Sequence, residues 1–164
     1  MPSQVLKPFN STVEIALRAM FLLAATAPSK QSIQRLVYFD YLTIHSNDIV
    51  DGPYSIHPPI PNRTGEWLLR RETLQKALGL LIQRELASVT FEESGIYFSA
   101  TKLTEPFIEY FQSDYSVLLK ERAAWVSRKF GPMSENELAA FMNSHIATWG
   151  TTDIHVKRSK LFGG

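Results

Sequence analysis

The sequence predicts a mainly α-helical protein with a minor β component, and two adjoining patterns carry this prediction. Apolar residues first recur at three- and four-residue steps, the period of a helix, at Leu74, Leu78, Leu81 and Ile82. The period then becomes that of a strand, with β-forming residues at 89–91 and 96–98 on either side of a turn that ends in Gly95. A helix followed at once by a β-hairpin is typical of the second half of a winged helix.

These patterns divide the chain into three parts. We expect a winged-helix-like domain over residues 1–102, with a proline-rich loop at 45–64. A C-terminal helical extension over residues 103–150 is expected to follow, and its three helices can pack back on the domain. Residues 151–164 are polar and basic, and we expect them to form a flexible tail.

The N-terminal half contains two further predicted helices. Asn10 or Ser11 is expected to cap a helix that runs to about Ala25. A second helix, roughly from Ser32 to Ile44, carries apolar residues so densely that it should be buried on more than one side. We expect this second helix to form the centre of a small core.

The C-terminal half contains three more. Thr104 is expected to cap a short, strongly apolar helix. Ser113 or Asp114 caps the next one, and Ser134 with Glu137 forms a capping box at the start of the last.

Composition limits both the compartment and the class of protein. The chain has 164 residues, the size of one domain, and its hydrophobic content of 45% is that of a globular protein. It contains no cysteine, which excludes disulfides, thiolate nucleophiles and cysteine-based metal sites and favours the cytoplasm. The most apolar run, 19–27, is about half as long as a membrane span, and Glu14 and Arg18 stand where the apolar region of a signal peptide would start. We therefore expect neither secretion nor a membrane partner.

Basic residues before and along the helix of the predicted winged helix are the candidates for contact with nucleic acid or a partner: Arg63, Arg70, Arg71, Lys76 and Arg84. A net charge of +1 gives no long-range positive field, and Glu92 and Glu93 at the hairpin tip would repel phosphates. Arg70 and Arg71 also lie close to the apolar stripe, where they can pair instead with Glu66 or with carboxylates of the proline-rich loop. For this helix we favour a protein partner over DNA.

The last two predicted helices carry an apolar stripe that we interpret as a partner-binding face. Its candidate residues are Trp125, Phe141, Met142, His145 and Trp149. Tryptophan is a common interface anchor, and a histidine on such a stripe is more often a core or interface residue than a catalytic one.

Acidic residues and histidines gather in and near the proline-rich loop, at Asp40, His45, Asp48, Asp51 and His57. These residue types suit a divalent metal, but their spacing matches no metal-binding motif. The sequence also contains no P-loop, nucleophile elbow or dinucleotide fingerprint. We expect no metal, no cofactor and no enzymatic activity, and we keep as an alternative a metal-dependent hydrolase that uses Asp48, Asp51 and His57.

Four stretches, in order, resemble one protein family: PFNSTVEIALRAMFLLAA, LVYFDYLTIHSNDIVDGPYSIHPPIPNRTGEWLLRRE, GIYFSATKLTEPFIEYFQSDYSVLLKERAAWV and LAAFMNSHIATWG. They are similar to the small middle component of bacterial ABC-three-component systems, over about Pro8 to Gly150. Among the residues that carry the resemblance are Asn10, Arg18, Asp40, His45, Asp51, Gly52, Pro53, His57, Arg63, Gly65, Glu66, Arg70, Arg71, Glu72, Arg122, Trp125 and Trp149.

The resemblance implies a non-enzymatic adaptor that bridges an ABC-type ATPase, related to chromosome-maintenance and repair ATPases, to an effector protein encoded nearby. Such systems are expected to act against phages or plasmids. Nucleic acid is then a possible and indirect partner, and self-association into a homo-oligomer is possible. The alternative from another class is a free-standing winged-helix transcriptional regulator that binds DNA through Arg70, Arg71, Lys76 and Arg84.

Overall fold

The computed structural model describes residues 11–57 and 63–145, and residues 63–69 by their backbone alone. Its elements, in chain order, are α1 (Thr12–Thr26), β1 (Gln31–Ser32), α2 (Ile33–Ile44), the 3-10 turn η1 (Ser46–Asp48), α3 (Arg63–Gln83), β2 (Ser88–Glu92), β3 (Gly95–Ser99), α4 (Thr104–Ile108), α5 (Asp114–Phe130) and a helix over 135–145. The expected mainly α fold with a minor β component is confirmed.

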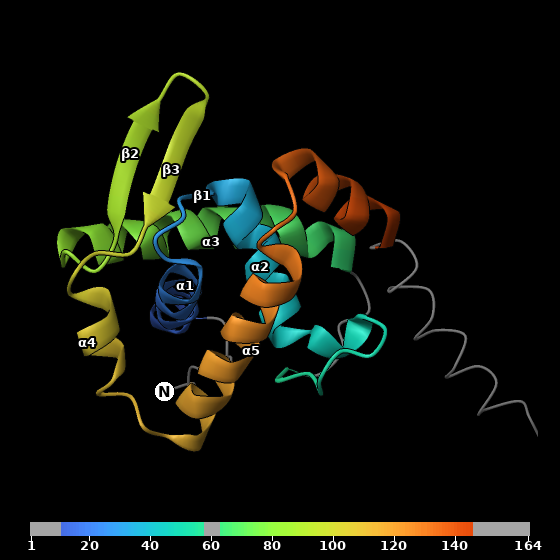
Figure 1. The fold of residues 1–164 in the computed structure, drawn as a ribbon, viewed down its shortest axis with the longest axis horizontal. Coiled ribbons are helices and arrows are strands. Elements are labelled where there is room, and N and C mark those ends of the chain that lie inside the picture. The colour runs from blue at the N-terminus through green and yellow to red at the C-terminus, as the bar shows by residue number, and fades with distance from the viewer. Residues whose placement is uncertain (1–10, 58–62, 146–164) are drawn as a thin grey trace, which may run out of the picture.

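Figure 1 shows the hairpin of β2 and β3 on one side of α3, with α1, α2 and α5 gathered on the other side and α4 at one end. α1 and α2 each pack against both α3 and α5, so the C-terminal extension shares one core with the N-terminal helices. The extension therefore packs back on the domain, as the sequence allowed.

Serine side chains begin four of the described helices. The hydroxyl of Ser11 accepts from the backbone N–H of Glu14, and Ser32 caps α2 in the same way. Ser113 caps α5, and Ser134 with Glu137 forms the expected capping box, with hydrogen bonds of 3.1 and 3.3 Å. Local side-chain chemistry thus sets these helix starts within a residue or two of their expected positions.

α2 is the central helix that the sequence predicts. Every residue from Arg35 to Ile44 is buried, which is unusual because amphipathic helices normally leave one face in water. Its apolar residues meet those of α1, α3 and α5 in a single core cluster. Among the described helices, none combines the length and the apolar character needed to cross a membrane.

The three strands form an antiparallel sheet in the order β1-β3-β2. The expected hairpin is confirmed: Val89 lies opposite Phe98, Phe91 opposite Ile96, and Glu92 opposite Gly95, whose φ of 148° favours glycine. β1 was not expected, since Gln31–Ser32 is too short to show a strand period. The interpretation of the hairpin as the wing of a winged helix stays a prediction.

α3 ends in a Schellman turn that directs the chain into the hairpin. The N–H of Leu86 donates to the carbonyl of Leu81 at 2.9 Å, and the N–H of Glu85 donates to that of Ile82 at 3.0 Å. Glu85 occupies the left-handed position with a φ of 61°, where glycine is usual. The first strand of the hairpin therefore starts at Ser88, a short turn after the end of α3 at Gln83.

Asp40 joins three helices through two buried arginines. Its carboxylate lies on α2 and accepts from Arg18 of α1 at 2.6 and 3.1 Å and from Nη1 of Arg70 on α3. Burial alone would raise the pKa of Asp40, but the two guanidinium groups outweigh burial and lower the pKa to about 2. For Arg18, burial lowers the pKa, and the Asp40 carboxylate more than reverses this. Asp40 and Arg18 are therefore both charged at neutral pH.

The substitution Asp40→Asn is expected to destabilise the fold by about 3–5 kcal/mol, because it leaves two buried guanidinium groups without their carboxylate. Urea denaturation of both proteins at neutral pH measures the difference. Asp51→Asn is the matched control: Asp51 is exposed and has a φ of 61°, which asparagine tolerates. Equal stability of the Asp40→Asn variant and the wild type would contradict the importance of this ion-pair cluster.

Candidate partner-binding site

The structure separates the basic residues proposed for nucleic-acid contact. Arg70 is only 6% exposed, and its guanidinium binds Asp40 in the interior, whereas the side chain of Glu66 lies outside the described residues. Arg71, Lys76 and Arg84 lie on exposed parts of α3 and its end, and Arg71 Nη1 donates to Gln34 at 3.2 Å. The side chain of Arg63 lies outside the described residues. A nucleic-acid role for this set stays a prediction, and burial argues against Arg70 as a contact.

The apolar stripe proposed as a partner face points largely inward. Met142 is buried, and Phe141 packs its ring 5.4 Å from that of Phe130 on α5. The ring of Trp125 lies 5.8 Å from Phe130, and His145 stacks on Phe141 at 4.2 Å. Trp149 lies outside the described residues. Amphipathic helices generally use their apolar face for their own core, so a partner role for these residues stays a prediction that burial does not favour.

The loop after α2 folds back on the end of that helix. The backbone N–H groups of Ile56 and His57 both donate to the carbonyl of Ile44, each at 3.0 Å. Ser46 Oγ donates to the carbonyls of Pro53 and Tyr54, and Arg122 of α5 donates to that of Tyr54 at 3.1 Å. These hydrogen bonds fix the loop against both α2 and α5.

The acidic residues and histidines of this region do not assemble as ligands. Asp40 binds its two arginines, and Asp48 accepts from the hydroxyl of Tyr41. Over residues 11–57 and 70–145, no group of three or more histidine, aspartate or glutamate side chains is placed to hold a metal ion. The hydrolase alternative built on Asp48, Asp51 and His57 therefore gains no support from the geometry.

His57 lies near Arg18 and Arg70 and contacts Tyr115 of α5. Its Nε2 is 3.3 Å from the hydroxyl of Tyr115, which donates to Glu14 of α1 at 3.2 Å. Burial is the main reason that the pKa of His57 falls to about 4, and the charge of Arg18 lowers it further. Burial and then the Glu14 carboxylate raise the pKa of Tyr115 to about 12. Both side chains are therefore neutral at pH 7.

One surface is more exposed than its apolar character leads one to expect, and it surrounds α4. Tyr110 is 84% exposed, Val117 is 50% exposed and Phe111 is 37% exposed. The rings of Phe107 and Phe111 meet edge to face at 5.5 Å, which makes one aromatic ridge. Exposed apolar side chains that gather in this way are typical of interaction surfaces.

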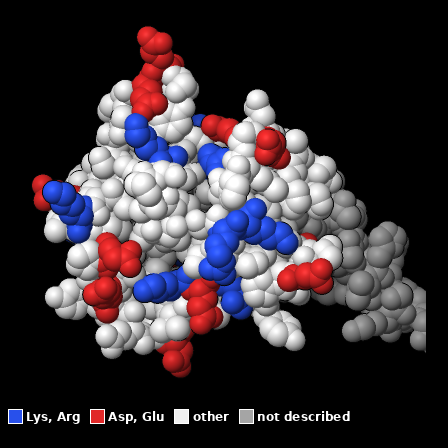
Figure 2. Space-filling view, in the orientation of Figure 1, with Lys and Arg blue, Asp and Glu red and all other residues white. Residues whose placement is uncertain are grey.

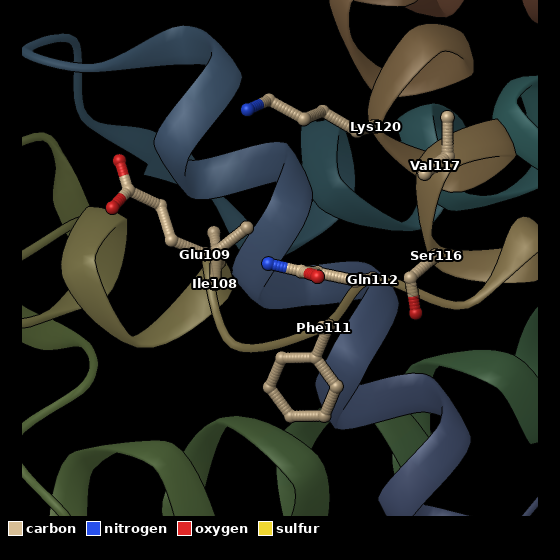
Figure 3. A pocket seen from close by; sticks show the side chains of 7 residues that line it. All are labelled: Ile108, Glu109, Phe111, Gln112, Ser116, Val117 and Lys120. Carbon is tan, nitrogen blue, oxygen red and sulfur yellow. The ribbon is translucent and has the colours of Figure 1, made fainter.

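A hollow of about 380 Å³, which we call the α4–α5 trough, lies on one side of this ridge, lined by Ile108, Glu109, Phe111, Gln112, Ser116, Val117 and Lys120. Figure 3 shows Ile108 and Glu109 at the end of α4, Gln112 in the connection, and Ser116, Val117 and Lys120 on α5. Ile108 and Lys120 also line a smaller hollow floored by Phe21, Ala24 and Ala25 of α1. The trough therefore offers apolar walls with one acidic and one basic side chain at its edge.

The sequence contains one signal for the exposed apolar surface around α4. α4 is only five residues long, yet the segment from Leu103 to Phe111 carries five large apolar residues besides Pro106. A single short turn of helix can bury only part of them, and here Ile108 is buried while Phe107 and Tyr110 are exposed. An excess of apolar residues over the surface available to bury them is thus the feature that indicates this surface.

Acidification is expected to destabilise the protein through His57. The ordinary pKa of 6.5 applies in the unfolded chain, whereas the folded chain holds the pKa of His57 at about 4. The unfolded state therefore binds the proton first, and stability is lost as the pH falls from 6.5 towards 4, by roughly 2–3 kcal/mol. Urea denaturation across this range, compared with His57→Gln, measures the loss. A variant with the same pH dependence as the wild type would contradict this assignment.

Comparison with known proteins identifies the family. Residues 8–152 match the family described as ABC-three component (ABC-3C) system Middle Component 2. No curated protein and no solved structure matches the chain. The match spans α1 to the helix over 135–145 and includes both the Asp40 cluster and the α4–α5 trough. The chain belongs to the family of Middle Component 2 of ABC-three component systems.

Proposed function

We propose that this protein is a non-enzymatic adaptor that bridges an ABC-type ATPase and an effector in a prokaryotic anti-phage or anti-plasmid system. Membership of a family of middle components supports the existence of further components in the same system. The lack of nucleotide-binding and catalytic motifs in the sequence supports a role in binding over one in catalysis.

The exposed apolar surface at the α4–α5 trough is the observation that carries this proposal. Phe111 and Val117 supply apolar contact, and Glu109 and Lys120 supply charges of both signs at the edge. Protein interfaces combine these features, because apolar anchors provide affinity while charged residues at the rim set the register. A partner helix that places apolar side chains into the trough is the binding mode that fits it best.

The trough is preorganised by its supports. The hydroxyl of Thr104 donates to the carbonyl of Leu86 at 2.9 Å and accepts from the N–H of Thr101 at 2.8 Å, which ties α4 to the end of α3. On the other wall, Ser127 Oγ of α5 donates to the carbonyl of Ala25 on α1 at 2.9 Å. A partner therefore meets two walls already held in place, which lowers the entropic cost of binding.

Co-purification of the tagged full chain with the products of its neighbouring genes, with and without ATP, tests the function. We expect a defined assembly that contains the ATPase and the effector. In that assembly Val117→Glu is expected to weaken binding at least about tenfold, because it places a charge in an apolar contact.

The matched control is Val50→Glu, which makes the same change at an exposed valine of the loop after α2. It is expected to leave the assembly intact. Recovery of the chain without any component would overturn the adaptor proposal. Equal loss of binding in both valine variants would instead reject the trough as the site while leaving the adaptor role in place.

A further inference from the structure

We propose that two copies of this chain form a two-fold symmetric dimer through the open edge of β2. In this dimer the hairpin tip of each copy lies over an apolar groove at the base of the hairpin of the other copy. The dimer does not rest on the adaptor function, since it concerns the hairpin and needs no other component.

β2 has an open edge. In the described part of the chain the sheet order is β1-β3-β2, so β2 pairs only with β3. Figure 1 shows β2 on the outer side of the hairpin, away from β1. Open edges are normally protected by proline, lysine or a bulge, because their unpaired N–H and C=O groups recruit another strand. The strand Ser88–Glu92 contains none of these residues and pairs without a break in register.

The hairpin also exposes an apolar pair near its tip. Phe91 is 75% exposed and lies opposite Ile96, which is 51% exposed. Val89 and Phe98 are the next pair on the same face, and Phe98 packs on the core. The apolar face of the hairpin thus continues past the core into solvent. An exposed apolar pair of this kind adds little to the stability of the isolated chain, but it can become buried in an interface.

A symmetric antiparallel pairing of two β2 strands makes favourable neighbours. With Thr90 on the two-fold axis, Phe91 of each copy lies opposite Val89 of the other, and Glu92 lies opposite Ser88. Aromatic and β-branched residues form favourable cross-strand pairs, and no two like charges face each other. The pairing would extend the sheet to six strands and cover both exposed phenylalanines.

The same register brings the hairpin tip to a groove of about 330 Å³, lined by Arg84, Leu86, Leu103, Pro106, Phe107 and Tyr110. We call it the α3–α4 groove. Glu93 at the tip lies opposite Ala87 of the second copy, three residues from Arg84, which is the charged residue of the groove lining. Figure 2 shows acidic side chains at the tip of the hairpin with basic side chains directly below them, where Lys30 pairs with Glu92. The acidic tip and Arg84 of the groove are therefore complementary in charge, and the two-fold symmetry gives two such contacts in the dimer.

Charge exchange tests the contact between tip and groove. Sedimentation of the purified full chain over a concentration series should show a dimer. Arg84→Glu and Glu93→Arg should each weaken it at least about tenfold, since each turns two attractive contacts into repulsive ones. The double variant should recover dimerisation, because both copies then carry the exchanged pair. Glu121→Lys, a charge reversal at an exposed site on α5, is the control and should leave the dimer unchanged.

Cysteine cross-linking tests the register, and the chain has no cysteine of its own to interfere. In a Thr90→Cys variant the two thiols face each other at a Cα separation of roughly 5 Å, within the range a disulfide spans. In Ser88→Cys the same face of the same strand carries the thiol, but the two copies are displaced by four residues, roughly 13 Å. Mild oxidation should therefore give a covalent dimer with Thr90→Cys and not with Ser88→Cys.

Three results would overturn the proposal. The first is a wild-type chain that stays monomeric at every concentration. The second is a double variant, Arg84→Glu with Glu93→Arg, that dimerises as weakly as the single variants although circular dichroism shows it folded. The third is equal cross-linking of Thr90→Cys and Ser88→Cys, which would mean random collision and not a fixed register.

Discussion

The buried carboxylate of Asp40 is the constraint on which the rest of the structure depends. A carboxylate in the interior is tolerated only when it is paired and hydrogen-bonded, and here α1 and α3 each supply one arginine to it. Buried ion pairs often add little net stability over a well-packed apolar alternative, but their hydrogen bonds are directional. Apolar side chains alone let helices slide or rotate with modest loss, whereas the Asp40 cluster accepts one relative placement of α1, α2 and α3.

The polar contacts continue from this cluster to the surface. Arg18 also interacts with Tyr115 at the start of α5, and Tyr115 in turn binds Glu14 and lies beside His57. The N-terminal end of α5 is therefore fixed against α1 by the same group of residues that fixes the three inner helices. Since α5 forms one wall of the α4–α5 trough, the geometry of the exposed surface depends on a buried interaction on the opposite side of that helix.

Local features of this fold could be predicted from the sequence, whereas long-range pairings could not. The helix periods, the serine caps, the dense burial of α2 and the hairpin all depend on residues within one or two turns of each other, and all are present. Arg70 binds Asp40, 30 positions earlier, and local spacing gave no indication of this pairing. The sign of the charge alone does not determine which acidic residue pairs with an arginine, because the packing of the helices determines it.

The same limit explains the candidate surfaces. An apolar stripe such as that of Phe141 and Met142 has one pattern whether it faces a partner or its own core, and here Phe130 of α5 covers it. Conversely, Leu103, Phe107, Tyr110 and Phe111 around α4 also follow a helical spacing, yet the structure leaves them exposed. Their exposure results from the shortness of α4, which the three-dimensional arrangement reveals and a period does not.

The two sides of α4 are suited to different occupants. The α4–α5 trough and the α3–α4 groove share no lining residue, so filling one leaves the other open. The ridge of Phe107 and Phe111 separates them, with Phe107 lining the groove and Phe111 the trough. A dimer formed through the hairpins would thus carry two free troughs, one on each copy. Because a two-fold axis relates them, a partner that is itself a dimer could bind both troughs at once, and its second contact would be intramolecular and correspondingly stronger.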